Sequence, residues 1–134
     1  MNGYLLDTHT FLWILISPKK LPAKVLAQTK DPESELFLSA VSLWEITLKA
    51  SKGKLDLRGV ALDELIGLAS EMGIVTISLS PEEAISQAHL AESTHSDPFD
   101  RMLIWQAISR KLTLVSGDTE FGRFKKHGLK LLWK

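Results

Sequence analysis

The chain has 134 residues, of which 45% are apolar and 24% are charged, and its formal net charge is zero. This length provides one core of ordinary size, so we expect a single domain over residues 1–134. There is no cysteine, which excludes disulfides and thiolate sites for zinc or iron–sulfur clusters. The zero net charge gives no bulk signal for nucleic acid, although local basic patches can still bind it.

The first half of the chain alternates short apolar runs with helix-like patterns. Apolar residues at 4–6 and 36–38 predict two strands. Ser39 or Ser42 supplies an N-cap for a helix that Gly53 ends. Helices are expected over residues 11–16, 22–30 and from the Ser39 or Ser42 cap to near 52.

The second half repeats the alternation. Residues 74–77 are mostly β-branched and predict a strand, and the Ser80-Pro81 pair predicts the start of a helix. The remaining elements are expected as helices after Gly59, over 80–91, 97–110 and 120–126, and as strands over 112–115 and 129–133.

Strands that alternate with helices favour an α/β fold with a parallel sheet covered on both faces. We therefore predict a three-layer α/β/α sandwich around a central, mostly parallel sheet of about five strands. No signal peptide is evident, and the apolar run at 11–16 is too short to span a bilayer. The expected location is the cytoplasm, without a membrane partner.

Four acidic residues follow predicted strands or lie just inside the next helix, namely Asp7, Glu45, Asp100 and Asp118. In an open parallel sheet the carboxyl ends of the strands share one edge, and ligands bind there. Converging carboxylates repel one another, and a hard divalent cation is the usual reason to keep them. The pattern predicts a Mg²⁺ site, with Mn²⁺ as an alternative, and metal-assisted phosphodiester hydrolysis.

Each of these acids also has a structural interpretation. Asp7 and Asp118 suit helix N-caps, and Asp97 with the proline after it suits the start of the helix that carries Asp100. Glu45 lies in mid-helix on an apolar stripe, where no capping role exists. For Glu45 the alternative is an i,i+4 ion pair with Lys49.

At these residues the sequence resembles a known family. Leu-Leu-Asp-Thr-His at 5–9, Ser-Leu-Trp-Glu-Ile at 42–46, Asp-Pro-Phe-Asp-Arg-Met-Leu at 97–103 and Leu-Val-Ser-Gly-Asp at 114–118 are similar to the four acidic motifs of the PIN domain. The resemblance is to VapC-type toxins of type II toxin–antitoxin systems. It covers essentially the whole chain, with the four motifs in order.

The resemblance implies a metal-dependent endoribonuclease that leaves 5′-phosphate and 3′-hydroxyl ends and is inhibited by a VapB-type antitoxin. It also implies homodimers or toxin–antitoxin hetero-oligomers. The implied catalytic metal ligands are Asp7, Glu45, Asp100 and Asp118, and the implied second-sphere residues are Thr8, Asp97 and Ser116.

An acidic pocket repels RNA unless basic groups flank it. Arg101, beside Asp100, and Lys49, one turn after Glu45, are the candidates for phosphate contacts. Further basic residues, for which a solvated surface is the ordinary interpretation, are Lys52, Lys54, Arg58, Arg123, Lys125, Lys126 and Lys130.

Apolar side chains suggest contacts of two other kinds. Leu12, Trp13 and Leu15 are expected either to line a groove for a partner or to be buried under neighbouring helices. Core or interface anchors, rather than base-stacking platforms, are expected at Trp44, Trp105 and Trp133.

Two other functions are alternatives to the nuclease. A phosphatase of the haloacid-dehalogenase type needs a second acid two residues after the first, where this chain has His9. A catalytically silent RNA- or protein-binding module would be indicated by loss of one or more acids, and all four are present.

Overall fold

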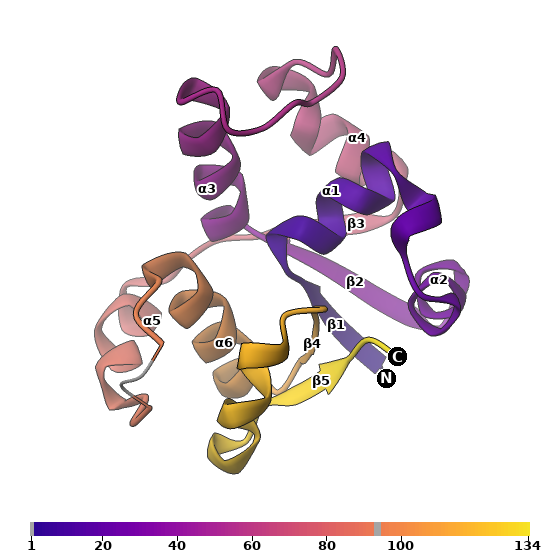
Figure 1. Ribbon diagram of the computed structural model, residues 1–134. Helices are drawn as coiled ribbons and strands as arrows, with labels where there is room; N and C mark the ends of the chain where they lie inside the picture. Colours follow the sequence, from indigo (N-terminus) through magenta and orange to yellow (C-terminus); the bar gives the residue numbers. More distant parts are fainter. Residues whose placement is uncertain (1, 93–94) are drawn as a thin grey trace.

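The computed structural model describes residues 2–92 and 95–134, which form a five-stranded sheet flanked by helices (Figure 1). The strand order is β3-β2-β1-β4-β5, and every neighbouring pair is parallel. The strands are β1 (Asn2–Leu6), β2 (Ser34–Ser39), β3 (Ile74–Ile77), β4 (Thr113–Val115) and β5 (Lys130–Leu132). The predicted strands are all present, and the predicted fold class is confirmed.

The helical segments comprise α-helices and short 3₁₀ turns. They are α1 (Thr8–Ile16), η1 (Pro18–Lys20), α2 (Ala23–Lys30), α3 (Ala40–Ser51), η2 (Leu62–Glu64), α4 (Leu65–Glu71), α5 (Pro81–Ser86), η3 (Gln87–His89), α6 (Pro98–Arg110) and η4 (Thr119–His127). Two predicted helices differ in kind. The helix expected over 80–91 changes to 3₁₀ geometry after Ser86, and the one expected over 120–126 is 3₁₀ throughout, with Gly122 as a weak helix former at its centre.

Two apolar cores lie on the two faces of the sheet. Leu5 and Leu6 of β1 are both fully buried, and because strand side chains alternate, they enter different cores. Leu6 packs with residues of α1, α2 and α4, whereas Leu5 packs with residues of α6 and η4. α3 contributes Val41 to one core and Ile46 to the other. This is the predicted three-layer arrangement.

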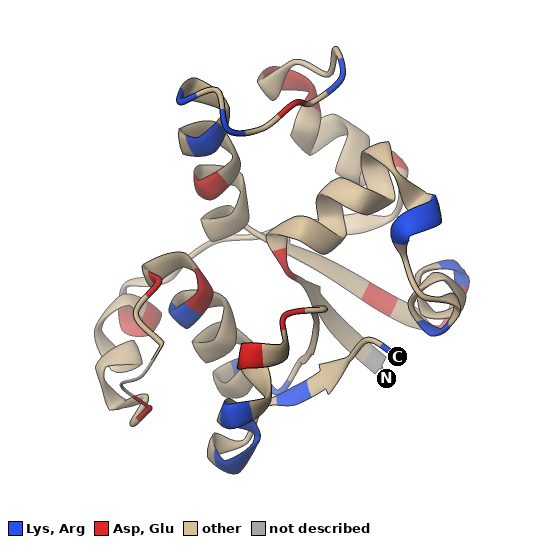
Figure 2. Cartoon of the chain, viewed as in Figure 1, with Lys and Arg blue, Asp and Glu red and all other residues tan. Residues whose placement is uncertain are grey.

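The central position of β1 places its carboxyl end beside those of two neighbours. Leu6 pairs with Leu38 of β2 and with Val115 of β4, so the residues that follow these strands lie side by side. The backbone N–H of Asp7 donates to the Val115 carbonyl at 3.1 Å and extends this register by one residue. Figure 2 shows acidic segments facing one another beyond this edge, with Lys and Arg at the end of α3 and along η4.

A network of hydrogen-bonded polar side chains connects the start of α3 with α5 and α6. The Ser39 hydroxyl caps α3 and donates to Oε1 of Gln106 at 2.6 Å. Nε2 of Gln106, which is fully buried, donates to Oε1 of Glu83 at 3.1 Å. Arg110 closes the network with bonds of 2.7 and 2.8 Å to the two oxygens of Glu83. The network fixes the start of α3 relative to α6.

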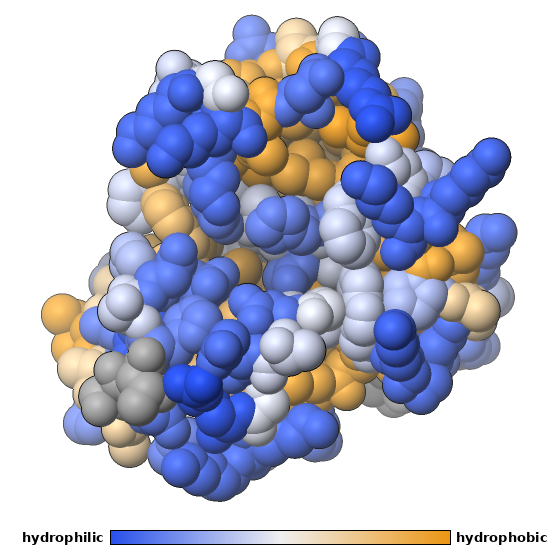
Figure 3. Space-filling model, viewed as in Figure 1, coloured by the Kyte–Doolittle hydropathy of each residue, from blue (hydrophilic) through white to orange (hydrophobic). Residues whose placement is uncertain are grey.

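Part of α1 remains at the surface, next to the segment that follows α3. Leu12 is buried, whereas Trp13 and Leu15 are only partly buried. A hollow of about 140 Å³ beside them is lined partly by Leu55 and Leu57, and Figure 3 shows apolar surface between α1 and α3. The expected burial is therefore confirmed for Leu12, and a groove for a partner stays a prediction. Within the described ranges, no helix has the length and apolarity to cross a bilayer.

Candidate functional site

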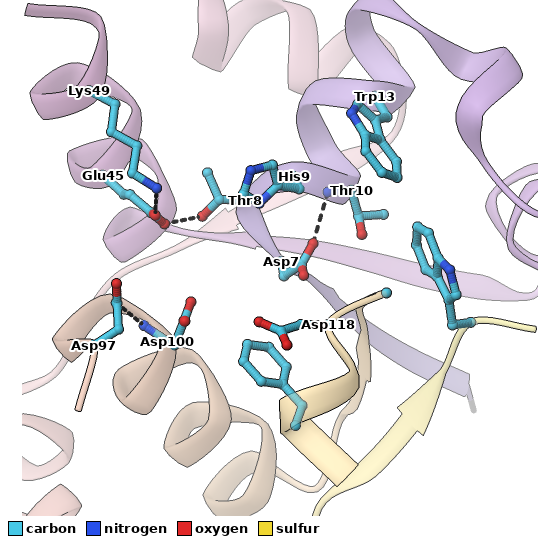
Figure 4. A pocket seen from close by; sticks show the side chains of 13 residues that line it. Asp7, Thr8, His9, Thr10, Trp13, Glu45, Lys49, Asp97, Asp100 and Asp118 are labelled. Atoms are coloured by element: carbon cyan, nitrogen blue, oxygen red, sulfur yellow. Dashed lines mark hydrogen bonds and ion pairs between the residues drawn. The ribbon is translucent and has the colours of Figure 1, made fainter. Parts of the chain in front are cut away.

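A cavity of about 390 Å³ lies at the carboxyl edge of the sheet, and all four predicted acids line it (Figure 4). Asp7 comes from the end of β1, Glu45 from α3, Asp100 from α6 and Asp118 from the start of η4. Segments that are far apart in the sequence therefore converge on one pocket, as predicted. Thr8, Lys49 and Asp97 also line it.

Asp7 combines a capping role with a place in the pocket. Its Oδ1 accepts a 2.8 Å bond from the backbone N–H of Thr10, so the alternative interpretation as N-cap of α1 is also right. The residue is 7% exposed. Burial raises the pKa of Asp7 above its ordinary value, and hydrogen bonding by Ser116 and Thr10 only partly opposes this effect.

Glu45 is buried in the middle of α3, where a lone carboxylate would be costly. It accepts a 2.6 Å bond from the Thr8 hydroxyl and a 2.5 Å bond from Nζ of Lys49. The ion pair that the sequence offered as an alternative is thus present, and Glu45 faces the pocket as well. Burial lowers the pKa of Lys49, but its hydrogen bond with Glu45 and the nearby carboxylate charges outweigh this, so the pKa is raised.

The third acid, Asp100, is held by a residue that the sequence did not single out. Nε2 of His95 lies 2.9 Å from Oδ2 of Asp100, and the histidine ring packs edge-on against Phe121 and Phe124 of η4. Burial raises the pKa of Asp100, the charges of Asp97 and Glu45 add to this, and His95 opposes it. His95 lies outside any regular element, so no periodicity in the sequence marks it.

Asp97 and Asp118 both cap helices. Asp97 accepts a 3.0 Å bond from the backbone N–H of Asp100, which confirms the predicted cap of α6. Asp118 accepts a 2.9 Å bond from the backbone N–H of Glu120 at the start of η4. Ser116 is buried behind the pocket, where its hydroxyl accepts a 3.1 Å bond from the Asp118 backbone N–H.

The predicted phosphate contact of Arg101 is not supported by its position. Its guanidinium donates to the backbone carbonyls of Leu90, Glu92 and His95, and Arg101 does not line the pocket. Because its guanidinium already donates to three backbone carbonyls, Arg101 stabilises the loop before α6 instead of binding a ligand. Lys49, by contrast, reaches the pocket.

Aromatic residues form the other side of the pocket. Trp13 and Trp133 line it with ring centroids 5.8 Å apart, and His9 packs edge-on against Trp13 at 6.4 Å. Trp133 was expected as a core or interface anchor, and nothing in the sequence indicates that it lines the site. Trp44 is 59% exposed and contacts Phe99, so it is not a core residue, and its role as an interface anchor stays a prediction.

The donor chemistry of the pocket fits a hard divalent cation. Among residues 2–92 and 95–134, no three His, Asp or Glu side chains stand close enough together to form a finished metal cage. Mg²⁺ does not require one, because it keeps several waters and is usually held by one or two carboxylates. The raised pKa values of Asp7 and Asp100 reflect buried acids that a cation would stabilise in the charged form.

The fold and the four convergent acids define a class of protein, and a family comparison agrees. The PIN domain model matches residues 4–127, so the chain belongs to the PIN domain family, as its motifs predicted. Over 127 residues the chain is 28% identical to the tRNA(fMet)-specific endonuclease VapC of Shigella flexneri, with 92% of each protein covered.

Solved structures show the same fold at lower identity. One is VapBC2 from Rickettsia felis bound to a DNA fragment from their promoter, with a TM-score of 0.71, 18% identity, and 98% of this chain and 99% of that chain covered. Another is VapBC-1 from nontypeable Haemophilus influenzae, with a TM-score of 0.69, 16% identity, and 97% and 96% covered.

Proposed function

We propose that this protein is a Mg²⁺-dependent endoribonuclease toxin of a VapBC-type toxin–antitoxin module, with Mn²⁺ as an alternative cofactor. The observation that carries the proposal is the convergence of Asp7, Glu45, Asp100 and Asp118 on one pocket at the carboxyl edge of the sheet. Membership of the PIN family and similarity to a VapC endonuclease support it.

One or two of the four carboxylates would hold the ion, together with several waters, and the others would line the same pocket. When bound, Mg²⁺ makes a water more acidic and offsets charge on the scissile phosphate. Figure 4 shows the side chains of Asp7 and Asp118 near one another at the centre of the pocket, where both could contribute to the same site. Both residues cap a helical segment, α1 or η4, and these hydrogen bonds fix their backbone. Binding of an ion therefore costs little further conformational entropy.

The other pocket residues orient and balance these acids. Thr8 donates to Glu45 and so fixes which way that carboxylate points. Lys49 neutralises Glu45 and places a positive charge at the rim, where it would attract a phosphate. His95 performs the orienting role for Asp100 from the opposite side.

A protein partner of the VapB antitoxin type belongs to the same proposal. Its support is the likeness in fold to VapBC complexes and the apolar hollow beside Trp13 and Leu57. RNA is the proposed substrate, and a homodimer or a toxin–antitoxin hetero-oligomer is the proposed assembly.

The test compares two Asp→Asn variants that make equivalent local bonds. Asp7→Asn keeps an oxygen for the Thr10 cap but removes a pocket charge. Asp31→Asn is the control, because Asp31 also accepts from a backbone N–H, that of Glu33, and lies outside the pocket. We expect Asp7→Asn to abolish growth arrest on induction and Mg²⁺-dependent RNA cleavage in vitro, and Asp31→Asn to retain both. Equal arrest by wild type and Asp7→Asn would instead indicate a binding or nonspecific effect.

A further inference from the structure

The acidic pocket has a second wall, made of indole rings rather than carboxylates. Trp13 from α1 and Trp133, just after β5, both line the pocket and are only partly buried. Figure 4 shows Trp13 on the side opposite Glu45 and Lys49. The pocket is therefore polar and charged at one side and aromatic at the other.

Trp133 is fitted closely to the loop that carries Asp118. A Cβ at Gly117 would lie 2.6 Å from Cε2 and 2.9 Å from Nε1 of Trp133, which is closer than real contacts allow. Only glycine at this position lets the indole lie against the loop. The aromatic wall is thus held directly beside one of the four acids, at a separation that the backbone fixes.

When Mg²⁺ is bound at the acids, a ligand that fits both sides has an anionic group at one end and a planar apolar group at the other. A nucleotide has this construction, and a cavity of about 390 Å³ falls within the size range of small-molecule sites. We propose that Trp13 and Trp133 form a stacking subsite for one unpaired nucleobase, adjacent to the phosphate held near the acids. The inference rests on the proposed nuclease function and adds a substrate preference to it.

Trp13 and Trp133 are the residues of this chain that would distinguish an unpaired base from a paired one. Stacking tolerates any base, because every base has a π-face, but the base must be free of its own stack to enter the pocket. The subsite therefore selects unpaired nucleotides in loops and ends rather than a particular sequence.

The experiment uses two small probes that differ only by the base. Isotope-labelled protein is titrated with adenosine 5′-monophosphate and with ribose 5-phosphate in the presence of Mg²⁺, and the four indole N–H resonances are followed by two-dimensional NMR. We expect adenosine 5′-monophosphate to shift the Trp13 and Trp133 resonances and to leave Trp44 and Trp105 unchanged. Ribose 5-phosphate should move neither pair.

A pair of variants measures how much the stack contributes to nucleotide affinity. Trp133→Leu should weaken binding of adenosine 5′-monophosphate by roughly 5- to 150-fold, the range for one base–aromatic stack, while binding of ribose 5-phosphate stays the same. Trp105→Leu is the matched control, because Trp105 donates to Ser86 on α5 and does not line the pocket.

The outcomes separate this subsite from the nuclease proposal. The subsite is refuted, and the nuclease proposal is unaffected, if RNA is cleaved normally but the Trp13 and Trp133 resonances do not respond to the nucleotide. A response of Trp44 in their place has the same meaning. A nucleotide response in a protein that cleaves no RNA overturns the nuclease and leaves the subsite. Indoles that respond only to an antitoxin peptide identify the wall as a protein contact and overturn the subsite.

Discussion

Glu83→Gln should destabilise the protein by removing the ion pair that joins α5 to α6. Glu83 is 8% exposed and receives two bonds from Arg110, at 2.7 and 2.8 Å. These bonds outweigh burial and lower the pKa of Glu83 from 4.5 to about 2. A fall of that size on folding corresponds to about 3 kcal/mol at neutral pH. The Arg110 side chain is 33% exposed and regains water when released, so we expect a loss of about 2 kcal/mol.

The measurement is the free energy of unfolding from urea titrations, repeated at decreasing pH. Because the folded-state pKa is lowered, the contribution of Glu83 is complete above about 4.5 and disappears as pH falls toward about 2. The difference in free energy of unfolding between wild type and Glu83→Gln should therefore become smaller as the pH falls. Glu82→Gln is the control, since Glu82 is an exposed acid in the same first turn and should cost under about 1 kcal/mol. A gap that stays constant with pH, or an equal loss in the control, would refute the reasoning.

Four further outcomes are expected. Lys49→Met leaves the buried Glu45 without its cation, so the free energy of unfolding measured in urea should fall by about 1–3 kcal/mol, and Mg²⁺ should recover part of it. Mg²⁺ alone should raise the melting temperature of the wild type in calorimetry, and a chelator should reverse this rise. His95→Ala should weaken calorimetric Mg²⁺ uptake by releasing Asp100, whereas His95→Gln, which retains a donor, should preserve more of it. Arg101→Gln should lower the melting temperature and leave RNA affinity unchanged below the transition, and the opposite pattern would restore the predicted phosphate contact.

The sequence predicts the layers of this fold because its local signals and its global pattern agree. Leu5 and Leu6 are both apolar because β1 is covered on both faces and adjacent strand residues point to opposite cores, and Asp7 directly after them caps α1. The 3₁₀ geometry of η3 and η4 was harder to predict, because 3₁₀ turns and α-helical turns have nearly the same hydrophobic spacing.

Only some of the residues in the site could be predicted from the sequence. Asp7 and Glu45 are predictable because strand ends meet at one edge and because a mid-helix acid on an apolar stripe needs a partner. His95 and Trp133 are not, because both lie in irregular segments whose path depends on tertiary contacts. The position of Arg101 differs from the expected one for a related reason. Its neighbour Asp100 faces the pocket, whereas adjacent residues on a helix point about a quarter of a turn or more apart, and Arg101 turns to the loop carbonyls.

The strand order also sets when the acidic pocket can form during synthesis. β1 is made before one of its two partners, β4, and before Asp118, which lie much further along the chain. A ribosome that has released only the earlier segments therefore carries a nascent chain in which β1 lacks one neighbour and the pocket lacks one of its four acids. Any activity that requires all four acids can begin only after the segment that follows β4 has emerged.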